Sequence, residues 1–120
     1  MFVSVVIPTY NRRPILEKCL SALADQQLAG VLQDYEVVVV DDGSTDGTPS
    51  WLRQQAHRFP HVRLIEQEHG GPAEGRNRGV DHARGDVIVF IDSDLVVTET
   101  FLATHARALK QCWQRRGDRL

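Results

Sequence analysis

The fold class is decided by the stretch Asp86-Val87-Ile88-Val89-Phe90-Ile91-Asp92-Ser93-Asp94, a continuous apolar run that ends in paired carboxylates. A run that is apolar throughout, instead of alternating, is typical of a strand covered on both faces of a parallel sheet. Residues 35–40 have the same character, and 3–7 and the weaker run 62–65 complete the set. We therefore expect four strands, the second and fourth of them buried on both faces.

Amphipathic patterns separate the four runs and predict helices. The first helix is entered through Pro14, which suits a first helical turn. Its apolar stripe consists of Ile15, Leu16, Cys19, Leu20 and Leu23. The pattern predicts a second helix over 48–56, with Trp51 and Leu52 facing inward, and a third over 73–83, with Gly85 as a left-handed stop.

A fourth helix is expected after Thr98, a residue type that favours the N-cap. Its apolar stripe consists of Phe101, Leu102, His105, Leu109, Cys112 and Trp113. The order is then strand and helix four times over, which predicts an α/β sandwich with a mostly parallel sheet and right-handed crossovers. We expect one domain over 1–114 and a frayed tail over 115–120.

Composition narrows the function classes. The 120 residues carry 14 Lys and Arg against 16 Asp and Glu, a formal net charge of −2, which argues against a strongly basic nucleic-acid binder. Lys18 and Lys110 are the only lysines, so phosphate binding by a loop lysine is hard to place. The chain shows no apolar run of ~20 residues and no signal peptide, which predicts a cytoplasmic protein with reduced thiols at Cys19 and Cys112.

Polar residues follow all four predicted strands. In a parallel α/β sheet, ligands bind at the carboxyl ends of the strands, so these segments predict the site. They are residues 8–12, 41–48, 67–72 and 92–94. Two of the four carry paired carboxylates, which a purely structural sheet has little reason to place there.

The sharpest of these features is Asp92-Ser93-Asp94. A spacing of two along an extended strand end points both carboxylates the same way. Converging oxygen ligands suit Mg²⁺ or Mn²⁺, shared with the phosphates of a substrate. The alternative is structural, with one aspartate capping the next helix and the other in solvent.

The pair Asp41-Asp42 precedes Gly43-Ser44, where turn chemistry is a sufficient explanation. Two adjacent acids at the end of an apolar run repel each other, which favours a functional role. One carboxylate would then bind a base or ribose while the other braces the loop. His69 is the only histidine near this predicted site, whereas His105 is expected to line the core.

The same residues resemble family 2 glycosyltransferases in four ordered motifs that span almost the whole chain. The motifs are Ser4-Val5-Val6-Ile7-Pro8-Thr9-Tyr10-Asn11-Arg12, Val39 to Thr48 through Asp41-Asp42-Gly43-Ser44, Gly70-Gly71-Pro72 with Gly75-Arg76-Asn77-Arg78-Gly79, and Gly85-Asp86 leading to Phe90-Ile91-Asp92-Ser93-Asp94. The resemblance implies a three-layer αβα sandwich with a Rossmann-like GT-A sheet. It also implies inverting transfer from a nucleotide-diphospho-sugar, in a setting of polysaccharide synthesis in the cytoplasm or at the inner face of the membrane.

The resemblance also implies roles for residues on the base side of the site. Pro8, Thr9 and Tyr10 would border the base, with Tyr10 packing on it. Asp42, together with Asp41, would bond the base, which is most often uracil in this family. The implied donor is therefore a UDP-sugar.

For the diphosphate side, the resemblance implies that Gly71 and Arg76 lie near the donor. Asp92 and Ser93 would bind the ribose, and Asp94, with Asp92, would hold Mn²⁺ or Mg²⁺. The metal would supply positive charge that no lysine provides.

The chain departs from the family in one respect, because the catalytic base is expected downstream of the Asp-x-Asp motif, beyond Leu120. Glu66, Glu68 and Glu99 do not match the motif that carries it. We therefore expect a donor-binding half that transfers sugar poorly alone. The uncovered sheet edge predicts a homodimer.

Other protein classes share parts of the pattern. A haloacid-dehalogenase-type phosphatase uses Asp-x-Asp, but on its first strand and with a downstream lysine. A receiver domain needs an acidic pair after the first strand, and a dinucleotide-binding fold needs Gly-x-Gly-x-x-Gly there. A non-catalytic nucleotide-binding or assembly module would share every motif, and it remains open at this point.

Overall fold

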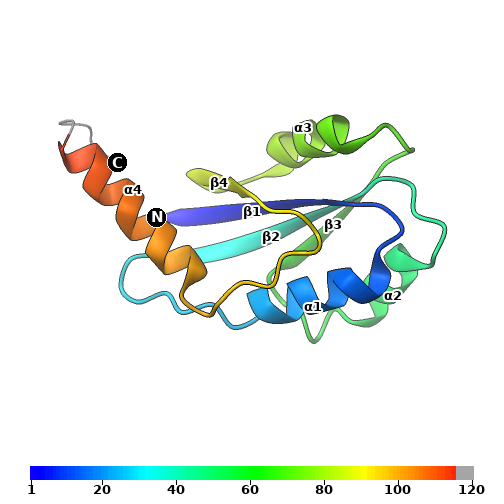
Figure 1. The fold of residues 1–120 in the computed structure, drawn as a ribbon, viewed down its shortest axis with the longest axis horizontal. Helices are drawn as coiled ribbons and strands as arrows, with labels where there is room; N and C mark the ends of the chain where they lie inside the picture. The colour runs from blue at the N-terminus through cyan, green and yellow to red at the C-terminus, as the bar shows by residue number, and fades with distance from the viewer. Residues whose placement is uncertain (116–120) are drawn as a thin grey trace.

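The computed structural model describes residues 1–115, with side chains through residue 112. Strands and helices alternate along the chain as predicted, and Figure 1 shows their arrangement. In chain order they are β1 (Phe2–Thr9), α1 (Arg13–Leu23), β2 (Asp34–Asp41), α2 (Thr48–Gln54), β3 (Val62–Glu66), α3 (Pro72–His82), β4 (Val87–Phe90) and α4 (Phe101–Arg115). The α/β class expected from the sequence is confirmed.

The four strands form one parallel sheet in the order β3-β2-β1-β4. Residues Phe2 to Thr9 of β1 pair with Asp34 to Asp41 of β2. Because all strands run the same way, the loops that follow β1, β2, β3 and β4 meet at the carboxyl ends of the strands. The candidate site lies at these strand ends.

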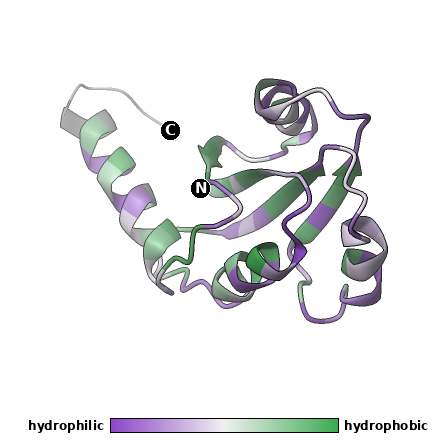
Figure 2. Cartoon of the chain, turned by 45° about the vertical axis from the view of Figure 1, so that its right-hand side comes forward, coloured by the Kyte–Doolittle hydropathy of each residue, from purple (hydrophilic) through white to green (hydrophobic). Residues whose placement is uncertain are grey.

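Helices cover both faces of the sheet, so the three-layer sandwich is confirmed. α3 lies on one face and α1 and α2 lie on the other (Figure 1). The larger core joins Val5 and Val37 of the sheet to Leu16 and Leu20 of α1, and Figure 2 shows how strongly the apolar residues concentrate in the strands. Ile15, placed on the apolar stripe from the sequence, is instead 44% exposed, so the buried stripe of α1 is narrower than predicted.

Two glycines allow the chain to pack closely against the strands. α3 approaches β1 at Gly79, where an added Cβ atom would collide with a methyl of Val6. The prediction that Gly85 is a left-handed helix stop is wrong, because α3 ends in extended backbone at Ala83. Gly85 is instead held against β1, since an added Cβ would lie 2.6 Å from the Ser4 hydroxyl oxygen and 2.8 Å from the Phe2 carbonyl.

β4 is not buried on both faces, which corrects the expectation for the fourth strand. It pairs with β1 alone among the described strands, and Phe90 is 47% exposed. β2, in contrast, is buried from Tyr35 to Asp41, as predicted. The unpaired side of β4 is an open sheet edge of the kind from which the sequence predicts a homodimer, and self-association stays a prediction.

Several further expectations concern α4 and the thiols. His105 was expected to line the core, but it is exposed and its ring packs edge-on against Phe101, with centroids 4.4 Å apart. Cys19 and Cys112 are free thiols, the first buried and the second half-buried. The side chain of Trp113 and the tail over 116–120 lie outside the described residues. Among those described, no helix has both the length and the hydropathy for a membrane span.

Candidate nucleotide site at the strand ends

A cavity of about 300 Å³ opens where the loops after the strands converge. This volume lies at the lower end of the range that small-molecule sites occupy. Its lining residues come from the ends of β1 and β2, the loop before α3, α3 itself and the segment after β4. They are Pro8, Thr9, Tyr10, Arg12, Asp42, His69, Pro72, Arg76, Asp92 and Ser93. The structure thus brings together residues from all four polar segments that the sequence singled out.

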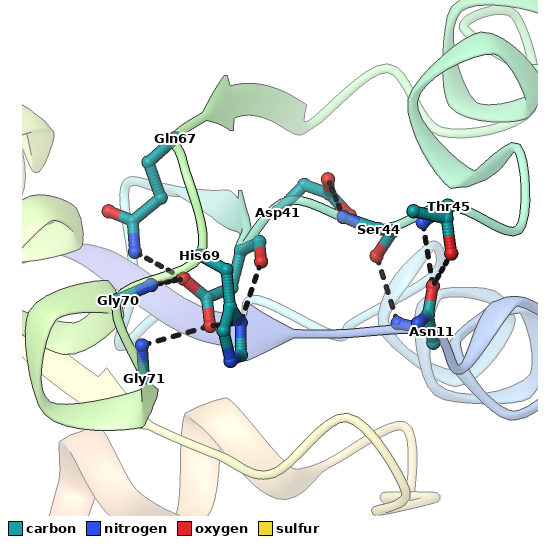
Figure 3. Close-up of polar contacts among 9 residues, drawn as sticks. Asn11, Asp41, Ser44, Thr45, Gln67, His69, Gly70 and Gly71 are labelled. Carbon is teal, nitrogen blue, oxygen red and sulfur yellow. Dashed lines mark hydrogen bonds and ion pairs between the residues drawn. The ribbon is translucent and has the colours of Figure 1, made fainter.

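Asp42 is the most heavily bonded side chain of the site. Its Oδ1 accepts hydrogen bonds from Gln67 Nε2 and the Gly70 amide, both at 2.8 Å, and its Oδ2 accepts from the Gly71 amide at 3.0 Å. Oδ2 also lies 2.9 Å from His69 Nδ1 (Figure 3). Burial by itself raises the pKa of the Asp42 carboxyl, but these hydrogen bonds outweigh it and hold the pKa below its ordinary value. Asp42 is therefore an anion that orders the loop before α3.

Asp41 is buried behind this loop and braces its own turn. Its Oδ2 accepts a hydrogen bond from the Ser44 amide at 3.0 Å, whereas its Oδ1 is buried without a hydrogen-bond partner. The hydroxyl of Thr9, which pairs with Asp41 in register, is likewise buried and unpartnered. Both acids thus form internal hydrogen bonds, although the sequence predicted that only one of them would brace a loop.

A second clamp ties the loop after β1 to the loop after β2. The Asn11 side-chain oxygen accepts a hydrogen bond from the Thr45 amide at 2.7 Å, and the Asn11 amide donates to the Ser44 hydroxyl at 2.9 Å (Figure 3). Asn11 has a φ of 50°, a left-handed conformation that asparagine adopts more readily than most residues. These bonds hold the Tyr10 side of the cavity in place.

One wall of the cavity is aromatic and exposed. Tyr10 is 42% exposed, and its ring centroid lies 4.3 Å from that of His69, with the planes inclined by 35°. The side chain of His69 is 60% exposed. A flat ligand that enters the cavity on this side therefore meets a Tyr–His pair.

The segment Asp92-Ser93-Asp94 leaves β4 with alternating exposure. Ser93 is buried, while Asp92 and Asp94 on either side of it are exposed. The chain then turns, because the Leu95 amide donates to the Asp92 carbonyl at 3.1 Å. Asp92 and Ser93 line the cavity, whereas Asp94 lies just outside its lining. Within the described residues, no three His, Cys, Asp or Glu side chains are grouped as metal ligands.

The cationic groups of the cavity are arginines. Arg76 on α3 lines this cavity and an adjoining one of about 290 Å³ beside β4, and the exposed Arg12 lines the first. Arg12, Gln67, His69 and Pro72 were not assigned to the site from the sequence. Their place in the polar segments after β1 and β3 was the available signal. Gly71, which was assigned, acts through its amide on Asp42.

Comparison with known proteins gives the family context of this geometry. The model described as glycosyl transferase family 2 matches residues 4–113. An uncharacterized glycosyltransferase of Bacillus subtilis (strain 168), YfnE, is 38% identical over 108 residues, which are 90% of this chain and 27% of YfnE. The poly(ribitol-phosphate) beta-glucosyltransferase of Bacillus spizizenii is 38% identical over 96 residues, which are 78% of this chain and 15% of that protein.

Solved structures show the same fold. S. aureus TarS 1-349 in complex with UDP-GlcNAc superposes with a TM-score of 0.80 at 32% identity, covering 92% of this chain and 32% of that one. The mannosyltransferase PcManGT from Pyrobaculum calidifontis, in complex with GDP-Man and Mn²⁺, gives a TM-score of 0.74 at 38% identity, covering 90% and 31%. The chain spans a third or less of each of these relatives. With four ordered motifs, a parallel sheet and a profile match over 4–113, the chain belongs to glycosyl transferase family 2.

Proposed function

We propose that the cavity at the strand ends binds the nucleoside diphosphate of an activated sugar, and that the protein carrying this chain transfers the sugar to an acceptor. One observation carries the proposal: Tyr10, Asp42, Arg76 and Asp92, from four different segments, surround a single cavity. Tyr10 offers a ring to the base and Arg76 a cation to the phosphates. The complexes of related structures with UDP-GlcNAc and GDP-Man support a nucleotide-sugar donor, and we take UDP-sugar as the donor here.

The residues after β4 fit a divalent cation. Asp92 and Asp94 are exposed carboxylates two residues apart, and Mg²⁺ is commonly held by one or two carboxylates together with substrate phosphates. We propose that Asp94, with Asp92, holds Mn²⁺ or Mg²⁺. When bound, the cation supplies positive charge to the diphosphate as it leaves. Arg76 supports the same charge from the opposite wall.

Transfer with inversion requires an acceptor hydroxyl to attack the anomeric carbon from the face opposite the diphosphate, while the bond to the diphosphate oxygen breaks. A base must take the hydroxyl proton. The two acids that line the cavity are already engaged, Asp42 in hydrogen bonds and Asp92 in the proposed cation site. We therefore propose that this chain binds the donor but transfers sugar poorly by itself.

The test is calorimetric titration of the protein with UDP, with Mn²⁺ present and with EDTA in its place. We expect EDTA or Asp94→Asn to weaken UDP binding by at least about tenfold, since one lost charged ligand costs 1.4 kcal/mol or more. Asp81→Asn, which changes an exposed acid near the end of α3, is the matched control and should bind like the wild type.

The absence of UDP binding, or binding that ignores Asp94→Asn, would overturn the donor site. Efficient transfer to a defined acceptor by the isolated chain would overturn the proposal that it lacks the base. A haloacid-dehalogenase-type phosphatase is disfavoured because its Asp-x-Asp follows the first strand, whereas here the motif follows β4. A non-catalytic binding module would bind UDP in the same way, and a longer protein carrying this chain would then also fail to transfer.

A further inference from the structure

Three hydrogen bonds within the chain use the Asp42 carboxylate, and His69 stands against its remaining side. An ionised carboxylate offers about four lone-pair positions. Gln67 and Gly70 donate to Oδ1, and Gly71 donates to Oδ2. The Nδ1 atom of His69 is hydrogen-bonded to the Asp42 main-chain carbonyl oxygen at 3.2 Å and also lies 2.9 Å from Oδ2. A nucleobase N–H that approached Oδ2 would therefore meet the His69 imidazole.

The three hydrogen-bond donors are fixed in place. Gly70 and Gly71 donate from the backbone directly before α3. Gln67 is anchored because its main-chain N–H group donates to the Asp41 carbonyl oxygen at 3.0 Å. The imidazole of His69 is different, since 60% of its side-chain surface is exposed. It can rotate away without any shift of the backbone.

The same imidazole also covers Tyr10. The two ring centroids lie 4.3 Å apart, so His69 occupies the space against Tyr10 that a base would need for stacking. One mobile side chain thus blocks both features that would recognise a base, the Asp42 oxygen and the Tyr10 ring. We propose that His69 is a placeholder for the nucleobase, which takes both contacts from it on binding. This inference rests on the proposed function.

The experiment compares UDP affinity, with Mg²⁺ present, for the wild type, His69→Ala and His57→Ala. His57 is an exposed histidine just after α2 and serves as the matched control. We expect His69→Ala to bind UDP about three to ten times more tightly than the wild type, because the base no longer has to displace the imidazole. His57→Ala should bind UDP like the wild type.

Pyrophosphate is the second probe, because it has no base. We expect the wild type and His69→Ala to bind it equally. Weaker or unchanged UDP binding by His69→Ala would overturn the placeholder while leaving the donor site intact. If the wild type and His69→Ala bound UDP equally but differed in pyrophosphate affinity, His69 would act on the phosphates. That result would also overturn the placeholder. No UDP binding by the wild type would overturn both the donor site and the placeholder.

Discussion

The hydroxyl of Ser4 donates a hydrogen bond to the carboxylate of Glu36 over 2.6 Å, between paired positions of β1 and β2 in the interior of the sheet. The same carboxylate accepts from the Arg84 amide at 2.7 Å and from Arg63 Nε at 2.9 Å. The Gly85 amide in turn donates to the Ser4 hydroxyl at 2.8 Å. This network joins three strands and the turn before β4 near the start of the strands, away from the cavity.

Glu36→Gln should therefore destabilise the fold without affecting the ligand site. The glutamine amide would point its own N–H group at other hydrogen-bond donors, and Arg63 would lose the anion that it pairs with. Loss of a buried charged partner lowers the free energy of unfolding by about 2–4 kcal/mol. Urea unfolding measures the loss. UDP affinity, measured well below the unfolding transition, should stay at the wild-type value. A variant as stable as the wild type would show that the network adds no net stability.

The free energy of unfolding should fall on acidification, because three carboxyl groups have lowered pKa values in the folded state. For Glu36, Asp42 and Asp46, burial raises the pKa, but hydrogen bonds outweigh it and leave each pKa below its ordinary value. A depressed pKa in the folded state stabilises the protein above the unfolded pKa of about 4 and ceases to do so as pH falls through the folded pKa. The free energy of unfolding should thus decline below about pH 4, as urea titrations at pH 7, 5, 4 and 3 will measure. Glu36→Gln should flatten the decline, and a parallel profile would contradict the assignment.

Asn11 should be needed for the shape of the cavity. Asn11→Ala removes the acceptor for the Thr45 amide and places alanine at a φ of 50°, so we expect a loss of about 1–2 kcal/mol in stability and weaker UDP binding. Asn11→Asp is the matched variant, because aspartate keeps the acceptor and tolerates this backbone conformation. It should stay close to the wild type in both measurements. If Asn11→Ala matched both Asn11→Asp and the wild type in stability and in UDP affinity, the hydrogen bonds of Asn11 would be dispensable.

The open edge of β4 gives a prediction about association. Phe90 is 47% exposed there, and Val96 in the following segment is 65% exposed. An unpaired, apolar strand edge favours pairing with another chain, so we expect a concentration-dependent dimer in light scattering. Phe90→Lys should return the protein to a monomer, while Lys18→Ala, on an exposed position of α1, should not. A wild type that stays monomeric at high concentration would contradict this prediction.

Much of the architecture could be predicted because its causes are local. Continuous apolar runs indicated the four strands, and polar residues after each run indicated the site, which lies at one edge because parallel strands end together. The Asp-Ser-Asp triplet follows β4 directly, so its place at the carboxyl end of a strand was readable from the sequence. These features depend on residues within a few positions of one another, so the sequence by itself determined them.

The tertiary structure decided what depends on distant neighbours. Hydropathy describes a strand but not how many strands flank it, so the run that ends in Phe90 proved to be an edge strand instead of a fully covered one. His105 matches a helical stripe yet is exposed, because it lines the open cavity beside β4 and not the closed core. The donors to Asp42 lie 25 to 29 residues further along the chain. Only the folding of β3 beside β2 brings them to it, so the internal hydrogen bonds of Asp42 depend on the tertiary structure.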